Sequence, residues 1–171
     1  MIEIKVASVD DLLIIQKIGR ETFLETFESK NSVENMKDYI EERFSELQVQ
    51  NELKNLESIF YIAWDQEDPI GYLKLNIGEA QTEFKMEDHI EIERIYVYSS
   101  HYGKQVGQLL FFKALETAKN LRVPTIWLGV WEENARAINF YKKNGFEEFD
   151  KHIFKLGADE QTDILMRRAV V

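Results

Sequence analysis

The chain has 171 residues, a formal net charge of −10, no Cys, 44% hydrophobic and 30% charged residues. This length favours one folded domain, residues 1–171, and the missing Cys excludes disulfides, thiolate nucleophiles and Cys-based metal sites. Strong acidity argues against nucleic acid as a partner. Without a signal-peptide pattern or an apolar run of membrane-spanning length, we expect a cytoplasmic protein with no membrane partner.

The acidity is distributed unevenly along the chain. Residues 1–101 carry a net charge of −12, whereas residues 102–146 carry +4. A basic segment can face an anionic cofactor while the acidic part faces a cationic substrate. The alternative, that the acidity only aids solubility, remains open.

The first half of the chain predicts a strand, three helices and a hairpin. Ile2, Ile4 and Val6 alternate with polar residues, which indicates a strand, and a capping box at residues 8–11 opens a helix. Two further helices are expected after Ser32 and over residues 47–56. Strands at 60–63 and 72–75 flank a turn at 65–69, and an acidic loop covers 78–88.

The second half predicts alternating strands and helices. A strand is expected at 89–98 and a helix at about 104–122; a second strand follows Pro124. Asn134 caps another helix, which ends at Asn144-Gly145, and strands at 146–156 and 163–169 complete the chain. This order predicts a mixed α/β architecture with one continuous sheet.

Residues 90–110 combine an acid pair with a glycine-containing turn. Glu91 and Glu93 lie two apart, so an ideal strand directs both to the same face, where close acids raise each other's pKa. Gly103 and Gly107 lie in a turn before a helix, and a helix N-terminus favours anions. The pattern indicates a phosphate-bearing cofactor beside proton-transfer groups, although a plain strand–turn–helix connection reads the same way. It is neither a Walker loop nor a dinucleotide fingerprint.

Residues 127–146, WLGVWEENARAINFYKKNGF, add a second motif at a suitable distance. Together the two motifs and the element order resemble the GNAT superfamily of acyl-CoA N-acyltransferases. The phrases ETFLETF (21–27), NSVENMKDYI (31–40) and IEIERIYV (90–97) are similar to PaiA-type polyamine N-acetyltransferases. The resemblance implies an α/β (α+β) GNAT fold: a single mixed, mostly antiparallel sheet with helices on both faces.

The resemblance also implies direct transfer of an acetyl group from acetyl-CoA to a primary amine of a small molecule, a polyamine such as spermidine or spermine. Protein N-termini and aminoglycoside-like amines are alternative acceptors, and a non-catalytic acyl-CoA-binding regulator is an alternative role. Tyr141 corresponds to the general acid, and Glu93, often through a water, to the base, with Glu91 as a second candidate. The residues alone leave three other roles open: Tyr141 as a core aromatic, an acid that only binds the cationic substrate, and an acid paired with Arg94 or Lys74.

The same resemblance implies cofactor contacts from the strand, the turn and the two helix starts: Ile95, Tyr96, Val97, Tyr102, Gly103, Lys104, Gln105, Val106, Gly107, Gln108, Asn134, Arg136, Ala137 and Lys143. Asn134 is equally natural as a helix cap, and Lys104, Arg136 and Lys143 as exposed charges. Tyr102 stands where Arg or Gln is usual, and Gln105 replaces the first motif glycine. Losing that glycine is tolerable only if residue 105 needs no positive φ.

Three further expectations concern the acceptor, metals and assembly. Glu25, Glu28, Glu34 and Asp38 are candidates to line a polyamine channel, or else belong to solvated helix faces. The three His residues show no metal-ligand spacing, so we expect no metal. A homodimer is left open.

Overall fold

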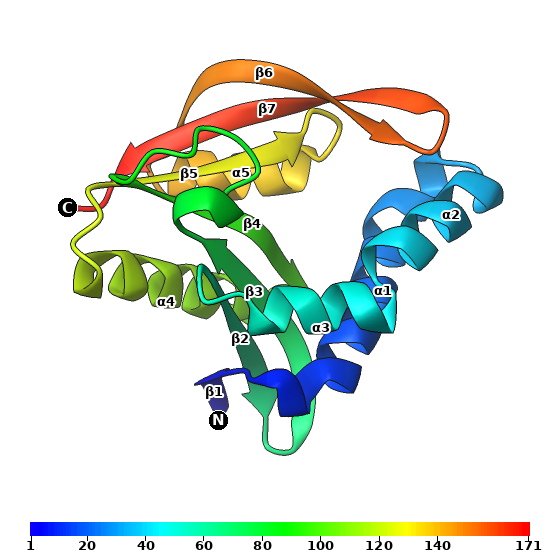
Figure 1. The fold of residues 1–171 in the computed structure, drawn as a ribbon, viewed down its shortest axis with the longest axis horizontal. Coiled ribbons are helices and arrows are strands. Elements are labelled where there is room, and N and C mark those ends of the chain that lie inside the picture. The colour runs from blue at the N-terminus through cyan, green and yellow to red at the C-terminus, as the bar shows by residue number, and fades with distance from the viewer.

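The computed structural model describes residues 1–171 and shows a mixed α/β fold (Figure 1). Its strands are β1 (Ile2–Val6), β2 (Ser58–Asp65), β3 (Asp68–Asn76), β4 (His89–Val97), β5 (Thr125–Trp131), β6 (Glu147–Leu156) and β7 (Asp159–Ala169). Its helices are α1 (Leu12–Phe27), α2 (Val33–Arg43), α3 (Glu46–Lys54), α4 (Val106–Asn120) and α5 (Ala135–Lys143). None of these helices has the length and apolar character needed to cross a bilayer.

The seven strands form one sheet in the order β1-β2-β3-β4-β5-β7-β6. All neighbouring strands are antiparallel except β4 and β5, which are parallel. The β4–β5 pairing covers only residues 89–92 and 125–128. Beyond these residues the two strands diverge, as Figure 1 shows. The divergence leaves one edge of β4 without a strand partner over residues 93–97.

A β-bulge interrupts β4 at the same point. Lys74 is opposite Arg94, but the next residue of β3, Leu75, is opposite Ile92. Glu93 is therefore the extra residue, and a bulge of this kind redirects side chains. Glu93 and its neighbour Arg94 both reach the α3 side of the sheet, where each contacts a side chain there.

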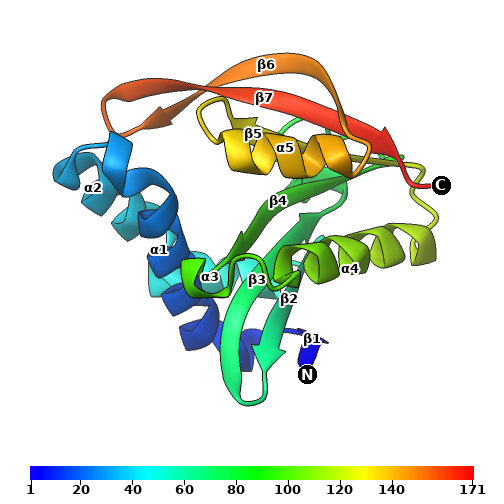
Figure 2. The same ribbon diagram turned by 180° about the vertical axis from the view of Figure 1, so that it is seen from behind.

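Helices cover both faces of the sheet. On one face α1, α2 and α3 bury a cluster that includes Ile15, Met36 and Val49 (Figure 1). On the other face, nearest the viewer in Figure 2, α4 and α5 bury a cluster that includes Leu110 and Ile138. The alternation of side chains along the central strands explains why one sheet serves two apolar layers.

The tip of the β6–β7 hairpin reaches across to the start of α2 (Figure 1). Nδ2 of Asn35 donates a hydrogen bond to Oδ2 of Asp159 over 3.0 Å. Nε2 of Gln161 donates another to Oδ1 of Asn31 over 2.6 Å. We call these two contacts the hairpin clasp. It connects the C-terminal hairpin to the N-terminal helices.

The predicted order of elements is confirmed, and the predicted caps explain several boundaries. Ser8 forms the expected capping box, Ser32 caps α2, and Asn134 accepts a hydrogen bond from the N–H of Ala137. Gly145 has a φ of +85°, which suits a residue that ends a helix. The main boundary errors are at β3 and β7, which begin at residues 68 and 159 rather than 72 and 163; α4 begins at residue 106 rather than about 104.

Candidate active site

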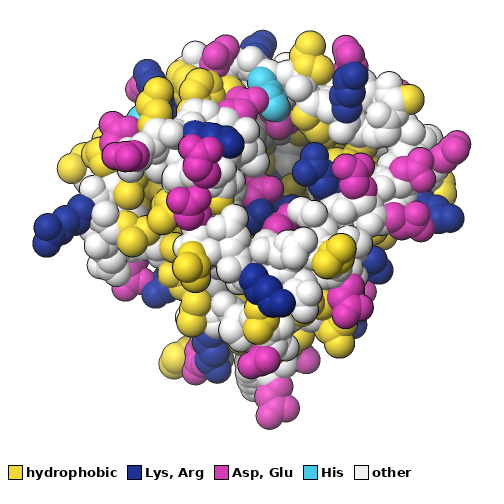
Figure 3. Space-filling view, viewed as in Figure 1, with side chains coloured by type: hydrophobic (Ala, Val, Ile, Leu, Met, Phe, Trp, Pro, Cys, Tyr) yellow, Lys and Arg dark blue, Asp and Glu magenta, His cyan; other side chains and the backbone are white.

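Two cavities lie where β4 and β5 diverge. One, of about 460 Å³, is walled by β4, β5 and β7 and is called the sheet cavity. The other, of about 430 Å³, lies over the turn before α4 and is called the loop cavity. They share the lining residues Ile95, Tyr96, Asn134, Ala137 and Tyr141. Figure 3 shows the molecular surface hollowed near the centre of this face, with acidic, basic and hydrophobic side chains together.

The loop cavity gathers most of the residues predicted to contact the cofactor. Lys104 and Lys143 are exposed and do not line it. The predicted residues that do line it are Ile95, Tyr96, Val97, Tyr102, Gly103, Gln105, Val106, Gly107, Gln108, Asn134, Arg136 and Ala137. Tyr141 and three residues that the sequence did not indicate, Thr26, His101 and Phe140, complete the lining. Phe140 lay within the quoted motif, whereas Thr26 arrives from a helix distant in the chain.

The start of α4 presents unpaired amide groups to the loop cavity. No backbone or side-chain acceptor in the protein takes the N–H groups of Gln105, Val106, Gly107 and Gln108. A fifteen-residue helix also carries partial positive charge at this end. Unpaired amides with this orientation suit a diphosphate, so the residues present fit the phosphate part of coenzyme A.

Gln105 corrects one expectation about this turn. The residue adopts a φ of +63°, in the left-handed region, immediately before α4. Gln105 therefore stands at a position that does require a positive φ, and the folded chain holds this non-glycine residue in a strained conformation. The other unusual residue, Tyr102, stacks under the guanidinium of Arg136, whose Cζ lies 3.3 Å from the ring centroid. This contact brings a cation to the wall of the loop cavity from α5.

Tyr141 lies at the junction of the two cavities. Its side chain is 6% exposed, and its hydroxyl makes no hydrogen bond within the protein. Burial raises the pKa of the phenol well above its ordinary value of 10. Tyr141 therefore keeps its proton at neutral pH and has it free to donate. It is also part of the core around Phe146, so the two readings of its sequence position are compatible.

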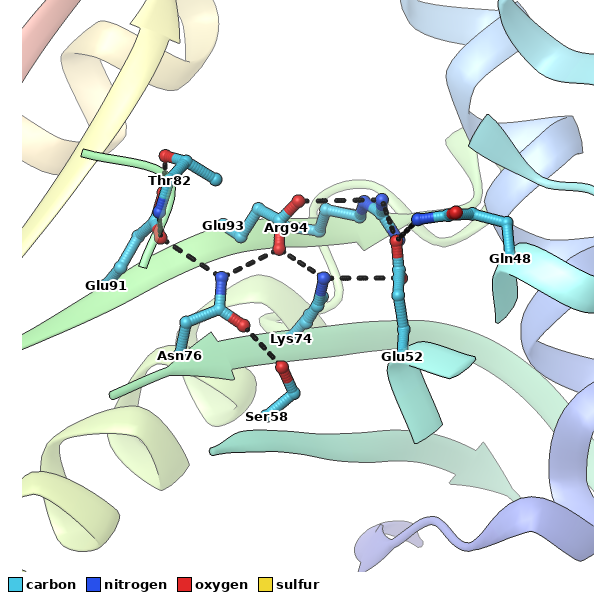
Figure 4. A network of polar contacts seen from close by, with 9 residues as sticks. All are labelled: Gln48, Glu52, Ser58, Lys74, Asn76, Thr82, Glu91, Glu93 and Arg94. Carbon is cyan, nitrogen blue, oxygen red and sulfur yellow. Dashed lines mark hydrogen bonds and ion pairs between the residues drawn. The ribbon is translucent and has the colours of Figure 1, made fainter. Parts of the chain in front are cut away.

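Glu91 and Glu93 point to the same side of β4 and are joined by one amide (Figure 4). Nδ2 of Asn76 donates to Oε2 of Glu91 over 3.0 Å and to Oε2 of Glu93 over 2.8 Å. Glu91 also accepts hydrogen bonds from the backbone N–H and the hydroxyl of Thr82. Both acids line the sheet cavity, as the spacing predicted.

Glu93 is held in an ion-pair network that draws on α3, β3 and β4 (Figure 4). It pairs with Lys74, and Oε1 lies 3.6 Å from Nη2 of Arg94. Glu52 contacts both cations, at 3.2 Å from Lys74 and 2.9 Å from Arg94. The expected pairing of an acid with Lys74 or Arg94 is thus present. Glu52 was not indicated by the sequence, although Lys74 within an apolar strand is a signal that a buried acid must lie nearby.

The network separates the two acids in their proton affinity. Burial alone would raise the pKa of Glu93, but Arg94 and Lys74 outweigh it and lower the pKa to about 2. Burial raises the pKa of Glu91, and Glu93 adds to this effect, against hydrogen bonds from Thr82. The expectation that the two acids raise each other's pKa therefore holds for Glu91 and is wrong for Glu93, because the two cations dominate there.

The opposite wall of the sheet cavity comes from the C-terminal hairpin and the loop 78–88. Glu83, His152 and Asp163 line it, with Nδ1 of His152 against Oε1 of Glu83. Arg43 and Lys155 also line the cavity, and neither has an ion-pair partner. Because these residues converge from three distant parts of the chain, no local sequence pattern indicates this wall.

The acids expected to line a polyamine channel are elsewhere. Glu25 accepts hydrogen bonds from the backbone N–H and the hydroxyl of Ser99, both at 2.9 Å, and so joins α1 to the end of β4. Glu28, Glu34 and Asp38 are exposed on the N-terminal helices. None of the four lines the sheet cavity, since the helix faces that carry them are turned away from it.

Comparisons with known proteins agree with this geometry. The acetyltransferase (GNAT) family matches residues 20–146. A protein described as an uncharacterized N-acetyltransferase, from Lactobacillus delbrueckii subsp. lactis, is 38% identical over 170 residues, covering 99% of this chain and 98% of that protein. The spermidine N(1)-acetyltransferase of Thermoplasma acidophilum is 28% identical over 153 residues, covering 87% of this chain and 90% of that protein.

Solved structures show the same architecture. The crystal structure of the PaiA N-acetyltransferase from Thermoplasma acidophilum, in complex with coenzyme A, has a TM-score of 0.82 at 25% identity and covers 99% of both chains. The ribosomal-protein-S18-alanine N-acetyltransferase of Escherichia coli has a TM-score of 0.75 at 16% identity, covering 99% of this chain and 94% of that one. The second similarity concerns the fold alone.

Proposed function

Because the chain belongs to the acetyltransferase (GNAT) family and is an N-acetyltransferase, we propose that it transfers an acetyl group from acetyl-CoA directly to the primary amine of a small molecule, a polyamine such as spermidine. The observation that carries this proposal is the meeting of the two cavities at Tyr141. One cavity offers unpaired amides for phosphates. The other offers carboxylates among aromatic side chains for a cationic amine.

The chain's own residues account for binding of the donor. When bound, acetyl-CoA supplies the thioester whose acetyl group is transferred. The amides of Gln105 to Gln108 bind its phosphates. The unpaired edge of β4, over Ile95, Tyr96 and Val97, offers backbone hydrogen bonds to the amides of the pantetheine arm, much as a strand edge receives an added strand.

Proton transfer is divided between two groups. Tyr141 holds its proton and delivers it to the departing sulfur. An alkylammonium has a pKa near ~10, so it must lose a proton before it can attack. With a pKa of about 2, Glu93 is too weak a base to take that proton directly. It stays ionised, attracts the ammonium and orients the water that carries the proton away, with Glu91 as the neighbouring acceptor.

Two observations support a polyamine acceptor. The sheet cavity combines four carboxylates, Glu83, Glu91, Glu93 and Asp163, with aromatic side chains that suit methylene segments. The relative from Thermoplasma acidophilum is described as a spermidine acetyltransferase. One observation favours a second candidate: Arg43 and Lys155 lack ion-pair partners and suit an acceptor that also carries a carboxylate, such as a peptide.

A coupled thiol-release assay tests these acceptors side by side. The panel contains spermidine, spermine, the aminoglycoside kanamycin and a short peptide with an N-terminal alanine. We expect turnover with the polyamines. Turnover confined to the peptide or to kanamycin would reject the polyamine. Calorimetric binding of acetyl-CoA with no turnover of any amine would instead favour the non-catalytic regulator.

A further inference from the structure

Asp163 stands apart from the other carboxylates of the sheet cavity. Glu91 is bonded to Thr82 and Asn76, Glu93 is paired with Lys74, and Glu83 is paired with His152. Asp163 lines the same cavity and makes no hydrogen bond or ion pair through its carboxylate. A half-buried carboxylate that makes no hydrogen bond or ion pair is costly, which points to a partner outside the chain.

The surroundings of Asp163 leave room for such a partner. Asp163 lies opposite Trp131 in the β5–β7 pairing, and its Oδ2 leans over Gly129. A Cβ at position 129 would lie 3.3 Å from that oxygen. Because Gly129 carries no side chain, the carboxylate can approach β5 closely at the wall of the sheet cavity, which Trp127 and Trp131 also line.

We propose that Asp163 binds a cationic group of the acceptor amine and thereby determines acceptor specificity. The proposal rests on the proposed function. It assigns to β7 a second contact with the substrate's charge, beside the attraction that ionised Glu93 of β4 exerts on the reacting ammonium. Trp127 and Trp131 line the same cavity, so the bound cation would lie among aromatic side chains.

The charge of Asp163 depends on pH in a range that can be measured. Burial raises its pKa to about 6, with Glu83 adding to this effect and His152 opposing it. Tyr39 on α2 is also within electrostatic range. Asp163 is ionised above pH 6 and neutral below it, so acceptor affinity should fall as the pH falls through 6. Between pH 7.5 and pH 5 the ionised fraction, and with it the affinity, drops about tenfold.

The test is Asp163→Asn, which keeps the shape of the side chain and removes its charge. The acceptor is the amine of the four-acceptor panel that the wild type turns over fastest. We expect the KM of Asp163→Asn for this amine to be at least tenfold higher than that of the wild type at pH 7.5. Turnover at saturation should stay within about threefold, and the dependence of KM on pH near 6 should disappear. Glu160→Gln is the matched control, because Glu160 is on the same strand, is exposed and lines neither cavity.

A KM within twofold of the wild type for Asp163→Asn, with an unchanged pH profile, would overturn the inference and leave the proposed function standing. Calorimetry with spermidine alone gives a readout that does not need turnover. If the wild type acetylates nothing but binds spermidine, and Asp163→Asn weakens that binding, the inference stands and the proposed function fails. Gly129→Ala provides a second variant, since its methyl group crowds Oδ2 and should raise KM in the same direction.

Discussion

The backbone of Gln105 illustrates how a single residue can carry a strained conformation at a binding site. A non-glycine residue in the left-handed region costs about 1–2 kcal/mol, and such strain persists where the surroundings require it. Here it directs successive amides of the α4 start toward the loop cavity. The turn therefore keeps the shape of a glycine turn without the glycine.

Gln105→Gly should stabilise the protein. Glycine removes about 1–2 kcal/mol of backbone strain from the folded state. It also loses more backbone entropy on folding, which costs about 0.5–1 kcal/mol. The free energy of unfolding should therefore rise by about 0.5–1 kcal/mol. Denaturant unfolding measures it. Gln105→Ala is the control, because alanine keeps the Cβ and should give no gain. Equal stability of the two variants would show that strain is absent.

Tyr141→Phe should lower turnover about a hundredfold or more, as expected when a general acid is removed. Coenzyme A affinity should change little, because the hydroxyl makes no bond in the protein and the ring remains. Steady-state kinetics and calorimetry separate the two quantities. Tyr61→Phe serves as the control, since Tyr61 bonds Thr117 and lines neither cavity. Unchanged turnover would remove the assigned role of Tyr141.

At the level of single residues, spacing alone placed Glu91 and Glu93 on one face, and the motif singled out Tyr141, which lines the same cavity. Neither the spacing nor the motif could reveal the β-bulge at Glu93, because the bulge depends on the pairing of β3 with β4 rather than on the sequence of β4 alone. They also could not reveal Asp163, which reaches the site only because β7 pairs with β5. Local patterns predict the direction of a side chain, whereas long-range register decides its partner.

Between elements, the buried ion-pair network fixes α3 against β3 and β4. Glu52 comes from the helix, Lys74 and Arg94 from the two strands, and all three are largely buried. A buried pair contributes little net stability compared with apolar residues, but loss of one partner leaves uncompensated charge. The role of the network is therefore to hold the bulge that carries Glu93 in place against α3.

Glu52→Gln should lower the free energy of unfolding by about 3 kcal/mol, because Lys74 and Arg94 then share one carboxylate. Thermal and denaturant unfolding measure the loss. The matched control is Glu41→Gln, which removes a surface pair with Lys37 at 4.0 Å and should cost no more than about 0.5 kcal/mol. Similar losses for the two variants would contradict the network's role.

Whole elements were predicted more reliably than their contacts. Caps at Ser8, Ser32 and Asn134 and the glycine at 145 are local signals, and each marks a boundary that the structure shows. The parallel pairing of β4 with β5 joins segments more than thirty residues apart and breaks off after four pairs. No local pattern encodes where such a pairing ends, so the divergence that forms both cavities could not be foreseen.

Across the whole molecule, the two cavities meet at Tyr141. The proposed direct transfer requires donor and acceptor to occupy the two cavities at the same time. Initial rates measured over a grid of acetyl-CoA and amine concentrations should give intersecting reciprocal plots. Parallel plots, the pattern of a ping-pong reaction, would contradict the proposed direct transfer.

The hairpin clasp has a consequence for how this protein's relatives can diverge. Residues 147–169 line the sheet cavity and contribute nothing to the loop cavity. Two side-chain hydrogen bonds to the start of α2 hold their tip in place. Under the proposed function, the hairpin therefore belongs to the acceptor side alone, whereas β4 and α5 line both cavities. Substitutions confined to the hairpin should then change the preferred amine while the proposed phosphate contacts at the start of α4 stay the same.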